Sequence, residues 1–382
     1  MNILYISPYV PDVRARHAGG VCMGKTVETL KKRNQVTVLT FCNDENEKKL
    51  LADHPDYEAV STSRAEYVRK VLTRLDMPNM FALRRDRAFR KAVCRIIETK
   101  QIDAVHAEYT AMGQYGWIRK KYPGVRFHLV EHDVAIQSYE RKYKDSTGIR
   151  KLYYGAELRK VKRCEKQYVQ GADMVFTLNN KDQALLRERF GLQEVKVINP
   201  YYGVDFDREP EKTSKEQAIC FVGQMSRSEN HEAAERLIRI FKEMEAPGWR
   251  LNIIGAGPRP ELQAEESDRI HITGFVDDIN KEISKNQLAV FPLIHGAGIK
   301  LKVLLAFGLG VPVITSAVGA EGIDPAGNVI RLAETDDEFR EQIRRLISDD
   351  TEREALSKAS REYVQAHFGW DATEQLFQEV YS

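Results

Sequence analysis

Four glycine-rich segments, one after the opening strand and three directly after short apolar runs, carry the residue types that could bind an anion. Their sequences are HAGGVCMGK (with Gly19, Gly20 and Gly24), FVGQMS (with Gly223 and Gln224), NIIGAGP (with Gly255 and Gly257) and PLIHGAGIKLKV (with His295, Gly296 and Gly298). Glycine lets a backbone approach a phosphate closely, and a helix that begins at such a segment offers free N–H groups and a partial positive charge. A tight turn after a strand also needs glycine, so one segment alone has a structural explanation. Three of them in one half of the chain favour phosphate binding.

The fourth segment adds two cations to its glycines. Lys300 and Lys302 follow Gly298 at the predicted start of a helix, and two ammonium groups beside free amides suit a diphosphate. The alternative interpretation is a pair of solvated lysines at a helix start. No segment has the spacing G-x-G-x-x-G, and the sequence lacks the P-loop pattern G-x-x-x-x-G-K-[ST]. This argues against a dinucleotide dehydrogenase and against an ATPase.

The first half of the chain offers one histidine at a suitable place for chemistry. His132 and Asp133 follow the apolar run FHLVE, and ligands of parallel sheets bind at the carboxyl ends of strands. A structural histidine is the alternative. Glu131, Asp133 and Glu321 are acidic candidates by location only. No paired carboxylates lie on these segments, which argues against glycoside hydrolysis.

These residues must be positioned by strands and helices that alternate along both halves of the chain. Apolar runs predict strands at residues 3–6, 36–40, 104–106, 127–130 and 174–177, and again at 218–222, 250–254, 270–273, 288–291 and 311–314. Helical periodicity predicts helices at residues 26–33, 86–100, 150–170, 231–244, 276–285, 301–308, 336–347 and 370–381. This alternation indicates an α/β protein with two doubly wound parallel sheets, each covered on both faces. The segment VINPYYGVD, residues 197–205, carries Pro and Gly without helical period and is the expected hinge.

Composition and charge narrow the class of protein. The 382 residues are 42% hydrophobic and 30% charged, as in an ordinary globular protein of two domains. The five cysteines are scattered without a C-x-x-C pair, so we expect neither a zinc site nor a disulfide framework, and a reducing cytoplasm fits. The opening residues are typical of a strand, and the longest apolar run, residues 303–314, is too short to span a membrane.

Basic residues concentrate in the first half. Residues 1–200 hold 37 Lys and Arg against 24 Asp and Glu, whereas residues 201–382 hold 21 against 32. The excess gathers at residues 64–95, where Val68, Val71, Leu72 and Leu75 recur at helical spacing, and at residues 141–166. Two solvated helices are one interpretation; a surface for anionic lipid headgroups or an anionic acceptor is the other. No nucleic-acid-binding motif is present, so nucleic acid is not an expected partner.

The motifs resemble those of glycosyltransferase family 4. FVGQMSRSENHEAAERLI, LNIIGAGP, ITGFVDDI and PLIHGAGIKLKVLLAFGLGVPVITSAVGAEGI are similar to the family's donor domain, in the branch with FxGxMxxxxN and GxGxRLKxLEAxAxGxPVVxTxxGxEG. VINPYYGVD resembles the inter-domain VIPNGVD, and HFGWDATEQLFQEVY resembles the closing helix. The resemblance is strong over residues 218–323 and loose over residues 40–100.

This resemblance implies a GT-B fold, in which two Rossmann-like domains face each other across a cleft. The implied domains are residues 1–197 on the acceptor side, residues 198–366 for the nucleotide-sugar donor, and residues 367–382 as the closing helix. The implied activity is metal-independent, retaining transfer of a sugar, of hexosyltransferase type, from a nucleoside diphosphate to an acceptor. No cofactor beyond this co-substrate is expected.

Site residues follow from the same resemblance, position by position. His132 is expected beside the reacting sugar, with Lys300 stabilising the leaving diphosphate. The expected donor-binding residues are Gly19, Gly20, Gly223, Gln224, Gly255, Gly257, Gly274, Phe275, Val276, His295, Gly296, Ala297, Gly298, Ile299, Lys300, Lys302 and Leu305. Among these, Gly274, Phe275 and Val276 are expected around the nucleobase, and the segment from Gly296 to Lys302 around the diphosphate.

Two positions depart from the family pattern. Ala297 and Leu305 stand where the family has a pair of glutamates separated by seven residues, of which the second binds the ribose hydroxyls. A leucine cannot accept a hydrogen bond from a diol, so ribose recognition must differ here or be absent.

The leading interpretation is therefore a glycosyltransferase of cell-surface polysaccharide biosynthesis. We expect it in the cytoplasm, with peripheral contact to an anionic membrane and a glycan or lipid-linked acceptor. A catalytically degenerate GT-B protein that acts in binding or assembly is the main alternative, motivated by Ala297 and Leu305. A sugar-nucleotide epimerase of the same fold is the third.

Overall fold

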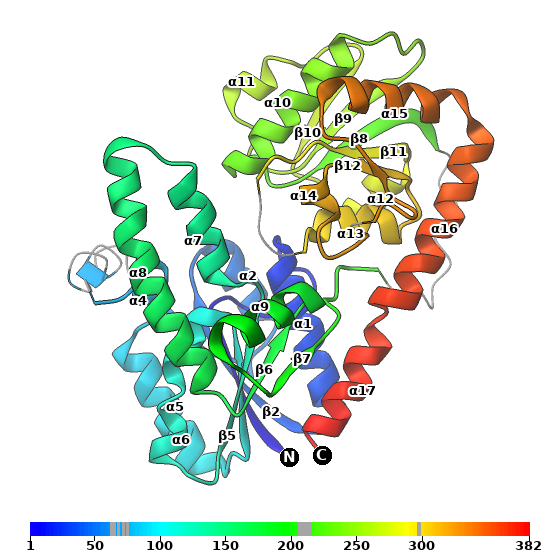
Figure 1. Ribbon diagram of the computed structural model, residues 1–382. Coiled ribbons are helices and arrows are strands. Elements are labelled where there is room, and N and C mark those ends of the chain that lie inside the picture. The colour runs from blue at the N-terminus through cyan, green and yellow to red at the C-terminus, as the bar shows by residue number, and fades with distance from the viewer. Residues whose placement is uncertain are drawn as a thin grey trace. The chain divides into compact units, whose positions relative to one another are not determined.

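The computed structural model describes residues 1–61, 66, 69–70, 73, 76–204, 215–295, 299–324 and 326–382. They form two compact units: unit 1 consists of Met1–Tyr201 with Trp370–Ser382, and unit 2 of Tyr202–Gly369. Each unit contains one parallel sheet flanked by helices (Figure 1). This confirms the predicted α/β class with two doubly wound sheets.

The sheet of unit 1 has seven strands in the order β3-β2-β1-β4-β5-β6-β7. Their bounds are β1 (Asn2–Ser7), β2 (Gln35–Cys42), β3 (Glu58–Ser61), β4 (Ala104–Glu108), β5 (Arg126–Glu131), β6 (Met174–Thr177) and β7 (Val195–Val197). The sheet's order reverses between β1 and β4, which pair in parallel. Crevices for ligands form at the carboxyl ends of strands at such a switch point.

Helices cover both faces of this sheet because successive side chains of a strand point to opposite faces. Ile3 and Tyr5 of β1 belong to the apolar cluster with α1 and α17, whereas Leu4 and Ile6 belong to the cluster with α5, α7, α8 and α9. The helical segments of unit 1 are α1 (Ala18–Lys31), α2 (Glu45–Ala52), α4 (Asn79–Ala82), α5 (Arg87–Lys100), η1 (Thr110–Tyr115), α6 (Ile118–Lys121), α7 (Ala135–Lys144), α8 (Gly148–Gln170), α9 (Asn180–Phe190) and α17 (Trp370–Val380).

The C-terminal helix α17 packs on the first sheet. Trp370 Nε1 donates to Thr29 Oγ1 at 2.9 Å, and the Tyr381 hydroxyl lies 2.6 Å from His106 Nδ1. Phe377 is buried in the same cluster as β1. The last residues of the chain therefore complete the core of unit 1.

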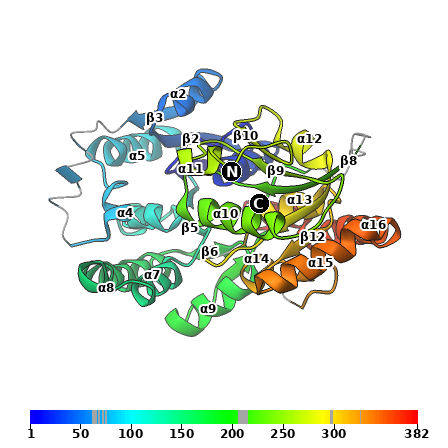
Figure 2. The ribbon, with the colours of Figure 1, turned by 90° about the horizontal axis from the view of Figure 1, so that it is seen from above.

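The sheet of unit 2 has six strands in the order β10-β9-β8-β11-β12-β13. Its strands are β8 (Glu216–Val222), β9 (Arg250–Ile254), β10 (Ile270–Gly274), β11 (Asn286–Phe291), β12 (Val313–Thr315) and β13 (Arg331–Leu332). The helices are α10 (Ser228–Lys242), α11 (Pro260–Gln263), α12 (Ile279–Ser284), α13 (Leu301–Gly308), α14 (Ala317–Ala320), α15 (Asp336–Ser348) and α16 (Asp350–Phe368). Figure 2 gives a second view of these elements. The order reverses between β8 and β11, and these two strands carry the second and fourth glycine-rich segments at their carboxyl ends.

The structure differs from the predicted elements at several places. Helix α1 begins at Ala18 rather than Thr26, so Gly19 and Gly20 lie in its first turn and not in a loop. The reason is the His17 side chain, whose Nδ1 accepts from Gly20 N at 3.0 Å and caps the helix. The helical repeat of Val68, Val71, Leu72 and Leu75 falls outside the described residues.

Two further observations concern the expected basic surface and the question of membrane-spanning helices. Lys70, within the first basic cluster, is buried and pairs with Asp86 at 2.8 Å, so it does not contribute a surface charge. Of the helices in the described part of the chain, none is both long enough and apolar enough to cross a membrane.

Candidate active site

His132 lies where β5 ends, at the carboxyl edge of the first sheet. Its side chain is buried, and Nε2 lies 2.6 Å from Glu108 Oε2 at the end of the neighbouring strand β4. Its ring stacks on the ring of Tyr109, with centroids 3.8 Å apart and planes 4° from parallel. The imidazole is therefore fixed by one carboxylate and one aromatic face.

Glu108 is the centre of a buried polar network. Its Oε1 accepts from the Tyr5 hydroxyl at 2.7 Å and lies 3.0 Å from His106 Nε2. Burial alone raises the pKa of Glu108, but hydrogen bonds from His106 and His132 outweigh it and hold the pKa well below its ordinary value. Glu108 is thus an ionised carboxylate, and it keeps the His132 ring in one orientation.

Tyr109 connects His132 to the start of α1. Its backbone has a φ of 69°, in the left-handed region that a tyrosine rarely adopts, and its N–H donates to Val130 O at 2.9 Å. A Cβ on Gly19 would lie 1.9 Å from the Tyr109 hydroxyl. A side chain at position 19 would therefore have to displace the Tyr109 ring, and the predicted residues Gly19 and His132 both lie against this tyrosine.

The two acidic candidates of this half, Glu131 and Asp133, are placed differently from His132, and a further acid that was not a candidate, Glu165, interacts with Glu131. Glu131 is fully buried and accepts from the Thr110 hydroxyl, and burial raises its pKa well above the ordinary value. Glu165 accepts from the backbone N–H groups of Ala135 and Ile136 at 2.6 and 2.9 Å, where α7 begins. Burial raises the pKa of Glu165 to about 7. Glu131 is therefore enclosed in the core, whereas Asp133 is exposed.

Three turns that contain glycine, at Gly223, Gly255 and Gly274, lie next to one another at the carboxyl edge of the second sheet. Gly223 N donates to Ile254 O at 3.0 Å, and Gly255 N donates to Gly274 O at 3.1 Å. Gly255 has a φ of 141°, and a Cβ there would lie 1.8 Å from Gly223 O. Only glycine fits this contact, so β8, β9 and β10 can end in a single close-packed row of turns.

Lys302 joins this row to the first turn of α13. Its Nζ donates to Asn230 Oδ1, and Asn230 Nδ2 donates to Gln224 O at 2.9 Å. Nζ also lies 5.4 Å from the centroid of the Phe221 ring. Burial lowers the pKa of Lys302 to about 7, and the charge of Arg227 adds to the effect. The second and fourth glycine-rich segments thus meet through one lysine.

Lys300 precedes α13 and is buried, with its Nζ 3.6 Å from Glu321 Oε2. Glu321 directly follows the short helix α14. The two lysines therefore have different partners: Lys300 faces a carboxylate and Lys302 an amide. The two solvated lysines of the alternative interpretation are not what the structure contains.

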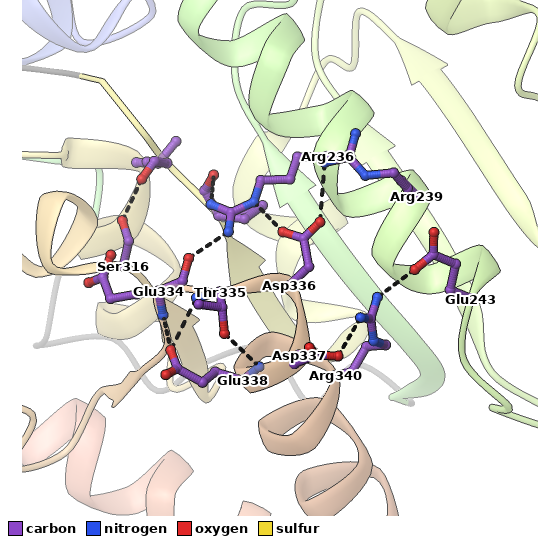
Figure 3. A network of polar contacts seen from close by, with 12 residues as sticks. Arg236, Arg239, Glu243, Ser316, Glu334, Thr335, Asp336, Asp337, Glu338 and Arg340 are labelled. Atoms are coloured by element: carbon purple, nitrogen blue, oxygen red, sulfur yellow. Dashed lines mark hydrogen bonds and ion pairs between the residues drawn. The ribbon is translucent and has the colours of Figure 1, made fainter.

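A polar network holds the strand end that leads into the fourth glycine-rich segment (Figure 3). Arg236 on α10 donates to Asp336 Oδ1 at 2.7 Å, to Glu334 O at 2.6 Å and to Pro292 O at 3.3 Å. The Ser316 hydroxyl donates to Leu293 O at 2.6 Å. These bonds fix the backbone immediately before His295.

The remaining predicted residues differ in their burial and packing. Gly296, Ala297 and Gly298 lie outside the described residues. Phe275 and His295 are exposed, with Gly274 and Val276 partly buried beside Phe275. Ile299 is buried and Leu305 is partly buried, and both belong to the packing around the core of unit 2. Gly257 has a φ of 71° that favours glycine, and Gly20 packs against the Ala15 side chain.

Sequence reasoning missed Glu108 and Tyr109, which position His132 in unit 1. It also missed Asn230 and Arg236, which hold the second and fourth glycine-rich segments in unit 2. Asn230 had a signal, because it is the final residue of the motif FxGxMxxxxN. Glu108 ends an apolar strand, which was a weaker signal. Within the described residues, no group of three or more His, Cys, Asp or Glu side chains is arranged to hold a metal ion.

Comparison with known proteins identifies the family. Residues 18–201 match the model of the glycosyl transferase 4-like domain, and residues 216–349 match that of glycosyl transferases group 1. No curated protein sequence matches the chain.

Solved structures share the fold at low sequence identity. Sucrose-phosphate synthase from Thermosynechococcus elongatus is 16% identical, with 100% of this chain and 98% of that chain covered, at a TM-score of 0.72. HepE from Anabaena, in complex with UDP, is 15% identical, with 100% and 99% covered, at 0.71. TarM from S. aureus is 9% identical, with 98% and 99% covered, at 0.66. Together with the family models that match both units, these likenesses show that the chain is a glycosyltransferase of the family 4 type with the GT-B fold.

Proposed function

We propose that the chain transfers a sugar from a nucleoside diphosphate to an acceptor glycan, glycolipid or small molecule, with retention of anomeric configuration. The observation that supports this most strongly is the row of glycine turns in unit 2, with Lys302 tied through Asn230 to Gln224. A partly buried ammonium group beside these turns suits the negative phosphates of a donor. Because HepE was solved with UDP and with UDP-glucose, a uridine diphosphate sugar is the first donor to test, with UDP as its binding probe.

In the proposed reaction the bond between the anomeric carbon and the diphosphate oxygen breaks, and its electron pair leaves with the diphosphate. The acceptor oxygen bonds to the same face of the sugar, and its proton passes to the departing phosphate oxygen. Lys300 and Lys302 stabilise the charge that develops on the diphosphate. In this proposal cations and amides perform this stabilisation, and no metal ion takes part.

His132 is proposed to contact the donor sugar and to favour the positive charge that develops at its anomeric carbon. Its fixed bond to ionised Glu108 supports this role, because a preorganised group needs no reorientation in the transition state. Gly19 is proposed to offer its amide, at the positive end of α1, to an anionic part of donor or acceptor. The amide of Gly20 donates to His17 Nδ1, so Gly20 is proposed to line the same surface without donating to the anion.

Titration calorimetry with UDP, GDP and ADP tests the donor site. We expect one of them to bind, and we expect Lys302→Met to weaken that binding about 10- to 100-fold, the range of a charge-assisted contact. Lys358→Met, an exposed lysine of α16, is the matched control and should bind as the unchanged protein does. A folded protein that binds none of the three would refute the proposal.

A catalytically degenerate binding protein is the second candidate, and Leu305 favours it. Leu305 packs against the core of unit 2, where the family has a glutamate that binds ribose. Binding of a nucleoside diphosphate without release of it from any sugar nucleotide, over a panel of donors and acceptors, would select this candidate.

We place the reaction in the cytoplasm, as part of cell-surface polysaccharide synthesis at a membrane. The scattered cysteines support a reducing compartment, and all five are free in the structure. The excess of basic residues in the first half supports peripheral contact with anionic lipid.

A further inference from the structure

An apolar patch lies on the turn between α7 and α8, which we call the hairpin tip (residues 142–153). Among the described residues eight large apolar side chains are exposed, and four of them belong to the hairpin tip. Ile149 is 85% exposed and Leu152 is 77% exposed, while Tyr143 and Tyr153 are exposed to a smaller extent. Leucine and isoleucine exposed to this degree, and gathered in one place, indicate a surface that meets a partner.

The apolar residues of the patch lie on one face of α8 because of their helical spacing. At the start of α8, Leu152 and Tyr153 follow Ile149 by three and four residues, and Ala156 follows Leu152 by four, so these residues share one face. Further along the same face the exposed residues are Arg159 and Arg163. An apolar end followed by cations on one helix face is typical of a segment that lies at a membrane interface.

The hairpin tip projects from the edge of the sheet that carries His132. α7 begins at Ala135, just after β5 ends, and α8 runs back to the start of β6. The two helices lie side by side in both views (Figures 1 and 2). A helix of 23 residues is about 35 Å long, whereas β5 with its six residues spans about 20 Å. The tip therefore extends beyond the carboxyl ends of the strands.

The charged residues around the hairpin tip indicate which kind of partner it binds. Residues 141–166 contain ten Lys and Arg against three Asp and Glu. Two of these three acids, Glu157 and Glu165, are buried, whereas Lys142, Lys144, Arg150 and Lys151 are exposed. Like charges would repel a second copy of the same surface. Cations around an apolar centre instead fit a bilayer whose headgroups are anionic.

We propose that the hairpin tip binds an anionic lipid bilayer, with Ile149 and Leu152 entering the interface and the surrounding cations contacting headgroups. The purpose of this contact rests on the proposed function, because binding to the bilayer would hold the His132 edge of unit 1 close to a lipid-linked acceptor. Its test does not depend on turnover.

The test is co-sedimentation of the full chain with vesicles of phosphatidylcholine, with and without phosphatidylglycerol. We expect binding only with phosphatidylglycerol, and release at high salt. Ile149→Ser with Leu152→Ser should weaken binding at least tenfold, because two apolar anchors are lost. Arg150→Gln with Lys151→Gln should weaken it roughly 25-fold, at about fivefold per cation.

The matched control, Arg344→Gln with Lys358→Gln, removes the same charge from exposed positions of α15 and α16 and should bind vesicles as the unchanged protein does. The proposal is overturned if the chain ignores phosphatidylglycerol, or if the hairpin variants bind as well as the control. It is also overturned if the apolar variant abolishes self-association in sedimentation equilibrium instead, which would assign the patch to a second copy. UDP binding by each variant, measured by calorimetry, separates loss of the membrane surface from failure of the donor site.

Discussion

Lys302 provides a quantitative test of the donor site, because its protonation and the binding of a diphosphate must be linked. Burial and the nearby Arg227 lower its pKa to about 7 in the free protein. At a pH of about 8, roughly one molecule in ten then carries the charge. A bound diphosphate would favour the charged form and move the pKa toward its ordinary value of about 10.4.

Two numbers follow from this shift. Binding should take up about 0.9 proton per diphosphate near pH 8 and about 0.5 near pH 7. The dissociation constant should rise roughly tenfold for each unit of pH above about 7.5, because an increasing part of the free protein must first be protonated. The sign is fixed: a lysine whose pKa is lowered in the free state binds an anion less well as the pH rises.

The assay is calorimetric titration with UDP in buffers of different ionisation enthalpy, at pH values above about 7.5, where the phosphate itself no longer titrates. Lys302→Met should bind more weakly, with no proton uptake and a flat pH dependence over this range, whereas Lys358→Met should reproduce the unchanged protein. If the unchanged protein takes up no proton, or if Lys302→Met keeps the same pH dependence, then Lys302 does not contact the diphosphate and the reasoning is wrong.

Three further changes test the rest of the site. Glu108→Gln should keep the fold but lower kcat about 10- to 100-fold with little change in the donor KM, because His132 loses its ionised partner. Steady-state kinetics on the unchanged protein and the variant measure both constants, and an unaltered kcat would contradict the prediction. Gly19→Ala should reduce kcat because its Cβ would displace the Tyr109 ring, and Tyr109→Phe in the same chain should restore part of the loss by removing the hydroxyl in the clash. Leu305→Glu, assayed for donor affinity and turnover, should raise both if the second candidate function holds, and should lower both if the site is adapted to leucine.

Most of the central strands could be predicted from the sequence, because a strand buried on both faces is a continuous apolar run. The edge strands β3, β7 and β13 were missed: they have two to four residues and mix charged with apolar side chains. Edge strands are buried less, so their sequences carry less signal. The start of α1 was missed because glycine disfavours helix, and the His17 cap that overrides this preference is a side-chain contact.

Some residues of the candidate site could likewise be predicted from the sequence, and others could not. Glycine turns after strands could be found, because their backbone geometry demands one residue type, as at Gly255. The partners of His132 and Lys302 could not, because Glu108 and Asn230 reach them from other strands and helices. Chain order does not reveal such contacts until the topology of the sheet is known.

The net charge of each half of the chain does not indicate where an anion would bind. The half of the chain with excess acid, residues 201–382, is the half for which we propose an anion site. Several of its acids pair with arginine, as Asp336 does with Arg236 and Glu243 with Arg340. An ion pair on the surface has little effect beyond a Debye length of about 8 Å. At the edge of the sheet, Lys302 would act at contact distance, so a diphosphate there would meet a cation within an acidic unit.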